Sequence, residues 1–354
     1  KTRAFFATKT NPKLLIDFAG VKIFESATVD TNILLFENTS NKQHTICAVT
    51  KSKDKDNIKE LSDFVKQNQS VCNFSSSDSW VILSPIEQSI KQKIEAVGTP
   101  LKDWDIQINY GIKTGYNEAF IITTEKREEI LAACRTTDER KRTAELIRPI
   151  LRGRDIKRYG YDWAGLWLIN THNGVKGKYP PININDYPTI KQHLDIYWNR
   201  LKNRDDKGVT PYNLRNCAYM DDFFKPKIIY PNMTKYMPFV WDCNNFMTNQ
   251  KCFIITGKHT AFLTAFLNSS LFKFCFIDNF PKLGEQGREL SKIFFDKIPV
   301  LQPTDDTEKL FKELVKDIQQ SYTMNKAKFI DQLIFDLYNL SLEERTQIGF
   351  IEIK

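Results

Sequence analysis

A dense run of cationic side chains lies near the middle of the chain. The segment LIRPILRGRDIKRYGYDW, residues 146–163, holds five positive charges within eleven positions: Arg148, Arg152, Arg154, Lys157 and Arg158. Guanidinium and ammonium groups at this density can bind phosphate oxygens, and the aromatic rings that follow can pack against a sugar or a base. The alternative is a solvated surface on which the arginines pair with Asp155 and Asp162.

The positive charge of the whole chain is concentrated around this run. The 354 residues carry a net charge of +8. Residues 140–235 alone hold nineteen Lys or Arg and nine Asp or Glu, an excess of ten positive charges, so the rest of the chain is slightly acidic. A polyphosphate partner favours such concentration, because each neutralised phosphate releases counterions. A domain with an uneven surface charge and no nucleic acid would give the same count.

Three further segments carry side chains of the types that contact nucleic acid. The segment GIKTGYN, residues 111–117, is predicted to be the tip of a hairpin between the strand runs DIQINYG, residues 105–111, and EAFIIT, residues 118–123. The other two are the loop around residues 172–179 and the polar loop 279–290. Each is also explained by turn chemistry or solvation alone. With the cationic run, the predicted DNA-contacting residues are Lys113, Thr114, Tyr116, Asn117, Arg152, Arg154, Lys157, Arg158, Lys176, Lys178, Lys282, Gln286 and Arg288.

No motif of a complete catalytic site is present in the sequence. We find no P-loop, no glycine-rich cofactor loop after a strand, no nucleophile elbow and no Asn-Pro-Pro-aromatic loop. Four histidines and seven cysteines lack the spacing of a metal site. We therefore expect no catalytic residue, metal or cofactor in this chain, and reduced thiols in a cytoplasmic protein. The apolar run at 260–277 contains Lys273, which favours a buried helix over a membrane span.

The predicted elements describe an α+β protein in three parts. Residues 1–80 hold three apolar runs that predict buried strands at 14–18, 31–37 and 44–50. A helix is predicted to begin at Ser84, because Glu87 completes a capping box and Pro85 occupies the first turn. Residues 81–303 are β-rich, with strands also predicted at 166–170, 227–231, 239–241 and 251–256. Residues 304–354 form a helical tail.

Several blocks, taken in order, resemble one family. LLIDFAGVKIFESATVDTNILLFE resembles the last strands of the catalytic domain in γ-class, TaqI-like adenine DNA methyltransferases. INYGIKTGYNEAFIIT, LIRPILRGRDIKRYGYDW, NNFMTNQKCFIITG and IDQLIFDLYNLSLEE resemble the target-recognition domain and tail that follow it in type IIG restriction–modification enzymes. The resemblance implies the C-terminal part of such an enzyme: the end of a Rossmann-like methyltransferase sheet, then a specificity domain with C-terminal helices.

The resemblance also implies partners and cofactors. Double-stranded DNA would be the partner, together with upstream methyltransferase and nuclease domains of the same parent chain. S-adenosylmethionine and Mg²⁺ would serve the parent, which would methylate adenine at N6 at a specific site and also cut. No residue of this chain matches a catalytic position of the family, so this chain alone is expected to be inactive.

Two functions of other classes stay open. One is a protein–protein specificity or scaffold module whose basic patch binds an acidic partner, which a DNA duplex would not displace. The other is a complete enzyme with an unrecognised site, which would turn over S-adenosylmethionine alone.

Overall fold

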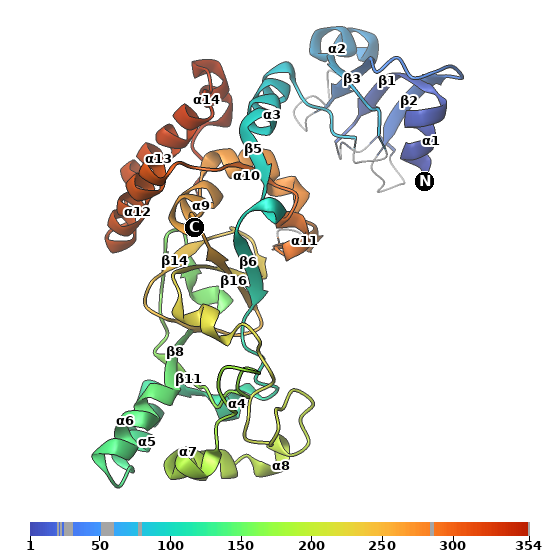
Figure 1. Cartoon of the computed structure of the whole chain (residues 1–354). Coiled ribbons are helices and arrows are strands. Elements are labelled where there is room, and N and C mark those ends of the chain that lie inside the picture. The colour runs from blue at the N-terminus through green and yellow to red at the C-terminus, as the bar shows by residue number, and fades with distance from the viewer. Residues whose placement is uncertain are drawn as a thin grey trace. The chain divides into compact units, whose positions relative to one another are not determined.

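The chain forms two compact units (Figure 1). The computed structural model describes residues 1–19, 21, 23–24, 31–50, 60–76, 80–283 and 287–352, and of residues 282 and 283 only the backbone. The smaller unit comprises residues 1–93 and 342–347, and the larger one the remainder. Both combine helices with strands, so the predicted α+β class is confirmed.

The smaller unit is built on a four-stranded sheet of order β2-β1-β3-β4. The β1–β3 pair is parallel and the other two pairs are antiparallel. Ile16, Phe18 and Val21 are buried, and the partly buried Leu61 and Val65 of α2 pack against them. The elements are α1 (Thr2–Lys9), β1 (Asn11–Asp17), β2 (Asn32–Glu37), β3 (Thr45–Val49), α2 (Leu61–Asn68), β4 (Ser70–Cys72), α3 (Pro85–Val97), which crosses the boundary, and α14 (Leu342–Ile348).

Two predictions for this unit have opposite outcomes. The capping box is confirmed, since Glu87 N donates to Ser84 Oγ at 3.3 Å and Ser84 N to Glu87 Oε2 at 2.7 Å. The predicted burial of residues 31–37 is wrong. Strand β2 lies at an edge of the sheet, and Leu35 is 57% exposed. Its apolar run gave no sign of its position in the sheet, because an edge strand can have the same composition as a central one.

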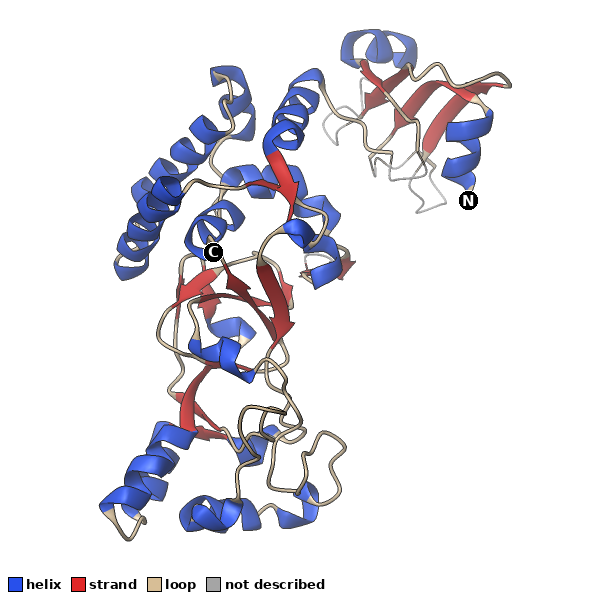
Figure 2. Ribbon diagram, viewed as in Figure 1, coloured by secondary structure: helices blue, strands red, loops and turns tan. Residues whose placement is uncertain are grey.

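The larger unit contains two four-stranded sheets (Figure 2). The first, of order β14-β12-β16-β6, is antiparallel throughout, and helix α9 packs against β12, β14 and β16. Strand β12 is buried along its whole length, including an ion pair of 2.6 Å between Lys227 and Asp242 at the base of the β12–β14 hairpin. The elements of this half are β6 (Ile106–Tyr110), β12 (Lys227–Pro231), β14 (Val240–Asp242), β16 (Cys252–Gly257), α9 (Thr260–Leu267), α10 (Ser270–Phe276), α12 (Asp305–Gln320) and α13 (Met324–Leu337).

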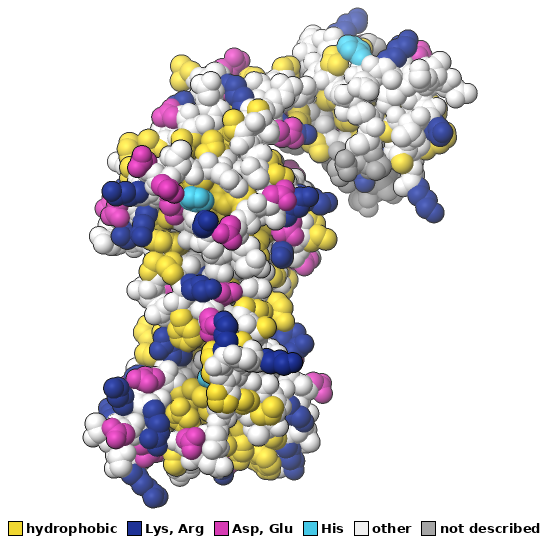
Figure 3. Space-filling view, in the orientation of Figure 1, with side chains coloured by type: hydrophobic (Ala, Val, Ile, Leu, Met, Phe, Trp, Pro, Cys, Tyr) yellow, Lys and Arg dark blue, Asp and Glu magenta, His cyan; other side chains and the backbone are white. Residues whose placement is uncertain are grey.

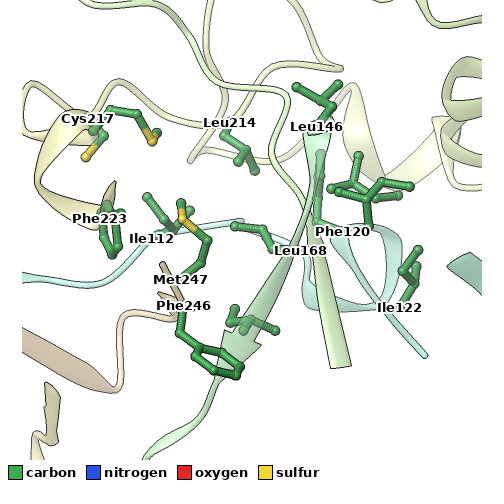
Figure 4. Close-up of a cluster of buried hydrophobic side chains, with 14 of the residues drawn as sticks. Ile112, Phe120, Ile122, Leu146, Leu168, Leu214, Cys217, Phe223, Phe246 and Met247 are labelled. Atoms are coloured by element: carbon green, nitrogen blue, oxygen red, sulfur yellow. The ribbon is translucent and has the colours of Figure 1, made fainter. Parts of the chain in front are cut away.

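The second sheet has the order β15-β8-β11-β7 and is covered by α5 and α6. Its buried side chains join those of the first sheet in one hydrophobic cluster, in which Phe120, Ile122, Leu168 and Met247 lie together (Figure 4). The elements of this half are α4 (Asn117–Phe120), β7 (Ile121–Thr123), α5 (Thr124–Ala132), α6 (Thr137–Leu146), β8 (Ile147–Leu151), β11 (Leu166–Ile169), α7 (Pro188–Asp195), α8 (Trp198–Leu201) and β15 (Met247–Thr248).

Short elements connect and extend these sheets. They are β5 (Gly98–Pro100), η3 (Leu101–Asp103), η4 (Gly153–Asp155), β9 (Ile156–Lys157), β10 (Gly160–Tyr161), η5 (Ile184–Asp186), η6 (Met220–Phe224), β13 (Met233–Thr234), η7 (Ile277–Asn279), β17 (Lys282–Leu283), β18 (Gly287–Glu289), α11 (Lys292–Phe295) and β19 (Pro299–Leu301). Three small sheets result: β10-β9, β13-β18-β17 and β19-β5.

The predicted hairpin at residues 105–123 is wrong. Strand β6 pairs with β16, whereas β7 pairs with β11 of the other sheet. The intervening segment runs against residues 248–252, where Gly111 N donates to Cys252 O at 2.9 Å. A Cβ at Gly111 would lie 2.1 Å from Asn249 O, so this glycine permits a close backbone approach rather than a turn.

The helix predicted over 260–277 is divided into α9 and α10. The Asn268 amide crosses to Phe239, whose backbone oxygen accepts at 2.8 Å, and Ser269 caps α10 by accepting from Phe272 N. Among the described residues no single helix is long and apolar enough to span a membrane, and α9 with α10 meets the length and composition only as a pair bent by 66°.

Candidate nucleic-acid interface

The cationic run, residues 146–163, divides into exposed and buried side chains. It starts on β8, passes through η4 and ends in the β9–β10 hairpin. Arg154 and Lys157 are exposed and Arg152 is half-buried, whereas Arg158 is only 4% exposed. These cations therefore differ in their surroundings, and they cannot all bind a ligand at the surface.

Arg152 is fixed by its own turn. Asp155 accepts from its Nε at 3.0 Å and its Nη2 at 2.8 Å, and also from its backbone nitrogen at 2.8 Å. This hydrogen bonding raises the pKa of Arg152. Because Asp155 is buried and fully engaged, the pair shapes the turn that carries Arg154.

Arg158 is placed in the interior, and this placement does not support its predicted contact with DNA. Its Nη2 donates to Asn268 O at 2.8 Å and its Nη1 to Ile351 O at 3.3 Å, with Asp331 4.0 Å away. The neighbouring Tyr159 has a φ of +57° and is also buried. The hairpin therefore turns these two side chains inward, where they anchor it to the loop between α9 and α10 and to the C-terminal residues.

The exposed part of the run borders a concave surface, which we call the arginine pocket. Its volume is about 600 Å³. The lining combines the run with two later segments, 233–238 and 249–251, that the sheets bring alongside, since Asn232 N donates to Lys251 O next to the β12–β16 pair. The lining residues are Arg152, Gly153, Arg154, Ile156, Lys157, Met233, Thr234, Tyr236, Pro238, Asn249 and Lys251.

The electrostatics of the arginine pocket favour an anion. Four of the lining side chains are cationic and none is acidic. Within the part of the chain that the structure describes, neither Arg154 nor Lys251 forms an ion pair. Lys157 lies 3.6 Å from an Asp162 carboxylate that is 81% exposed. An exposed pair of this kind is weak, so three cations remain available to a ligand.

On the face that Figure 3 shows, Lys and Arg of the larger unit are interspersed with Asp and Glu. The lining of the arginine pocket holds four cations, against two in the second concavity described below, and neither lining contains an acidic side chain.

A second concavity, which we call the lysine pocket, lies in the loop 173–181. It is lined by that loop and Asn216, and Gly177 at its turn has a φ of +79°. Lys178 Nζ is 2.5 Å from Asp221, which also accepts from the Tyr179 hydroxyl at 2.9 Å. These hydrogen bonds lower the pKa of Asp221. Lys176 is exposed and, among the described residues, has no ion-pair partner.

The predicted residues of segment 111–117 lie outside both pockets and are engaged with their neighbours. Lys113 is half-buried over the ring of Tyr110. The Thr114 side chain is buried and donates to Asn117 Oδ1 at 2.6 Å. Tyr116 donates to Glu118 at 2.5 Å.

Arg204 holds segment 111–117 in place. It is buried, donates to Thr114 O, and contacts the carbonyls of Pro211 and Asn213. Segment 111–117 therefore has a fixed conformation.

The loop 279–290 contributes to neither pocket in the described structure. The side chain of Lys282 and the whole of Gln286 lie outside the described residues. Arg288 pairs with Asp278 at 2.8 Å and donates to Phe280 O at 2.9 Å, so its guanidinium is engaged.

Sequence reasoning predicted Arg152, Arg154 and Lys157 as contacts but missed the rest of the lining of the arginine pocket, including Met233, Tyr236, Asn249 and Lys251. The last two lie in NNFMTNQKCFIITG, a block that carries the family resemblance. Met233 and Tyr236 lie in PNMTKYMP, which has no pattern beyond that of a turn. Within the described residues no three or more His, Cys, Asp or Glu are placed to hold a metal ion.

Comparison with known proteins confirms the resemblance predicted from the sequence. Residues 148–300 match the family model of the TaqI-like C-terminal specificity domain, a range that contains both pockets. Comparison with curated proteins gives no match.

Two solved structures are similar over nearly the whole chain. The type IIL restriction–modification enzyme MmeI, solved in complex with DNA, has a TM-score of 0.50 at 11% identity over 98% of this chain and 47% of its own. The type IIG restriction endonuclease BpuSI has a TM-score of 0.43 at 11% identity over 95% of this chain and 44% of its own. The chain spans less than half the length of either, and the likeness to MmeI concerns the fold.

Proposed function

We propose that the larger unit binds double-stranded DNA at the arginine pocket, as the specificity part of a restriction–modification enzyme. One observation carries the proposal. Inside the range that matches a specificity domain, a concave surface gathers four cations with no acidic side chain in its lining. A DNA backbone supplies the anions that such a surface binds.

The residues divide between phosphate binding and support. Arg154, Lys157 and Lys251 are the phosphate ligands, because their side chains line the pocket and are exposed. Arg152 with Asp155 sets the turn, and Arg158 anchors the hairpin from behind. Lys176, at the turn of the lysine pocket, adds a weaker contact. Phosphate contacts of this kind fix the register of a protein on the duplex, while other side chains read the bases.

The parent enzyme is part of the proposal. A longer chain with upstream methyltransferase and nuclease domains would use S-adenosylmethionine and Mg²⁺, and it would modify adenine at N6 and cut. The residues that the structure describes offer no cluster of metal-ligating side chains. Nothing in the proposed DNA contact uses a metal or a cofactor, and the role of this chain is to bind and orient the duplex.

The proposal is tested by fluorescence anisotropy of a labelled duplex with the full chain between about 50 and 200 mM salt. We expect binding that weakens linearly in log affinity against log salt. Arg154→Gln should lower the slope by about 0.9, the value for one phosphate contact. Lys309→Gln, an exposed position on α12 outside the pocket, is the matched control and should leave the slope unchanged. No binding at 50 mM salt would overturn the proposal, and binding of an acidic protein that a duplex does not displace would favour a scaffold role.

A further inference from the structure

One rim of the arginine pocket is a loop with exposed apolar side chains. Residues 232–239 connect β12 to β14, and four of them, Met233, Thr234, Tyr236 and Pro238, line the pocket. Met233 is 52% exposed and Tyr236 is 40% exposed. A large aromatic ring and a thioether held in solvent beside unpaired cations have no role in the hydrophobic core.

The loop is held in one conformation by its own hydrogen bonds. Thr234 Oγ1 accepts from Tyr236 N at 3.0 Å and from Met237 N at 3.2 Å. Met237 has a φ of +51°, which a non-glycine residue adopts only when its surroundings require it. Its side chain is fully buried and fixes the turn. Tyr236, next to it, is thereby directed outward.

Lys273 of α10 supports the same turn from the interior. Its side chain is 4% exposed, and its Nζ donates to Tyr236 O and, at 3.2 Å, to Met237 O. Among the described residues no carboxylate pairs with it. Burial of an ammonium group without a counter-ion is costly, and this lysine serves the two carbonyls behind the exposed ring.

Phosphate contacts alone do not require such a loop. Arg154 and Lys251 bind phosphate through charge, and a flexible neighbour would serve them equally well. Reading a base requires a side chain held at a fixed distance from the backbone contacts, because hydrogen bonds to base edges and packing against them are directional. Tyr236 offers both a ring and a hydroxyl at the rim of the pocket that holds the phosphate.

We infer that Tyr236, with Met233 beside it, contacts a base next to the phosphate bound by Arg154 and Lys251, and that Tyr236 determines sequence specificity. Lys273 is the positioning residue for this contact. The inference rests on the proposed function and adds to it the residues that read sequence.

The test measures sequence preference and phosphate binding separately. The full chain is used to enrich duplexes from a randomised pool, and the affinity ratio between an enriched and a scrambled duplex is then measured against salt. We expect Tyr236→Ala to lower this ratio about tenfold while leaving the salt slope unchanged. Tyr236→Phe keeps the ring and removes the hydroxyl group, so its affinity ratio shows how much of the specificity each group contributes. Arg154→Gln, the matched control, should lower the slope and leave the ratio unchanged.

Lys273→Met tests the positioning role. The ratio should fall as it does for Tyr236→Ala, again at an unchanged slope. If this variant does not fold, Thr234→Val removes the hydrogen bonds of the turn from the surface side and should lower the ratio in the same direction.

The outcomes separate the two proposals. A wild-type chain that binds no duplex overturns the proposed function, and the inference falls with it. A chain that binds but enriches no sequence, or a Tyr236→Ala variant with an unchanged ratio, overturns the inference and leaves phosphate binding in place.

Discussion

The arginine pocket and the lysine pocket are both lined by predicted cations, yet they differ in the placement of their acidic residues. Behind the arginine pocket, the carboxylate of Asp155 is buried and accepts hydrogen bonds from Arg152. The other cations of the pocket therefore remain exposed to solvent. Beside the lysine pocket, Asp221, which is not part of the lining, pairs directly with the lining residue Lys178. The local count of positive charge therefore overstates what is available for a ligand. The number of cations that form no close ion pair with a carboxylate is the better predictor of anion binding.

The largest expected effect is on stability and concerns the β9–β10 hairpin beside the arginine pocket. Arg158→Met should lower the free energy of unfolding by about 3 kcal/mol, because the buried Asp331 carboxylate loses its counter-ion and the carbonyls of Asn268 and Ile351 lose their donor. Arg154→Met should leave it nearly unchanged, since Arg154 is exposed. Urea unfolding of the two variants, monitored by circular dichroism, measures both free energies. Equal stabilities would contradict the assignment of Arg158 to the interior.

The next effect is on DNA affinity. The double variant Arg154→Gln with Lys251→Gln should weaken duplex binding on the order of fifty-fold at 0.1 M salt and lower the salt slope by about two. Fluorescence anisotropy measures both. The control is a pair of exposed lysines on α12, Lys309→Gln with Lys312→Gln. If the control has the same effect, binding depends on net charge rather than on the pocket.

A gain of binding would sharpen the comparison. Asp221→Asn releases Lys178 from its ion pair while an amide oxygen still accepts from Tyr179. The freed lysine should strengthen duplex binding about fivefold at 0.1 M salt and raise the slope by about one. An unchanged slope in the anisotropy titration would show that the lysine pocket lies outside the DNA contact.

The smallest effect is expected for Lys178 itself. Lys178→Gln should change duplex affinity less than twofold, because Asp221 binds the ammonium group of Lys178 at 2.5 Å, a much closer contact than the 3.6 Å between Lys157 and Asp162. Lys176→Gln, two residues away and without an ion pair among the described residues, should have the larger effect. A reversed order in the same titration would refute the proposed role of unpaired charge in binding.

Below pH 4 the lysine pocket should lose one stabilising interaction. The folded-state pKa of Asp221 is lowered by hydrogen bonds from Lys178 and Tyr179, so the ionised form is favoured on folding. This contribution is fully present above the usual value of 3.8 and is lost as the pH falls through the lowered pKa. The stability difference between wild type and Asp221→Asn should therefore shrink in acid denaturation at these pH values. A constant difference would exclude Asp221 as its source.

Local signals in the sequence predicted the elements but not their pairing. The capping box of Ser84 and the strands predicted at 166–170 and 227–231 were found from neighbouring residues alone, and the structure has them at 166–169 and 227–231. The strand that pairs with β6 was not predicted correctly. The choice between β7 and β16 depends on contacts between distant parts of the chain, which no local sequence pattern records.

The same limit applies to the site. Arg154 and Arg158 are equivalent in the sequence, and their separation follows from the inward turn at Tyr159 and from partners at Asn268 and Ile351. Tyr236 was missed because its exposure depends on Lys273, which lies in a buried helix far along the chain. Charge and composition indicated the type of ligand, whereas packing decides which side chains reach it.

The buried ion pair between Lys227 and Asp242 has a consequence for how specificity can change. It closes the base of the β12–β14 hairpin, whose register is also fixed by the neighbouring buried strand. The exposed side chains between these strands, Met233 and Tyr236, can therefore vary without shifting the sheet, whereas the buried Met237 and the pairing of β13 with β18 keep the backbone of the connection in place. Relatives with other target sites could arise by exchange of these exposed side chains, and the same exchange offers a route to designed specificities on an unaltered scaffold.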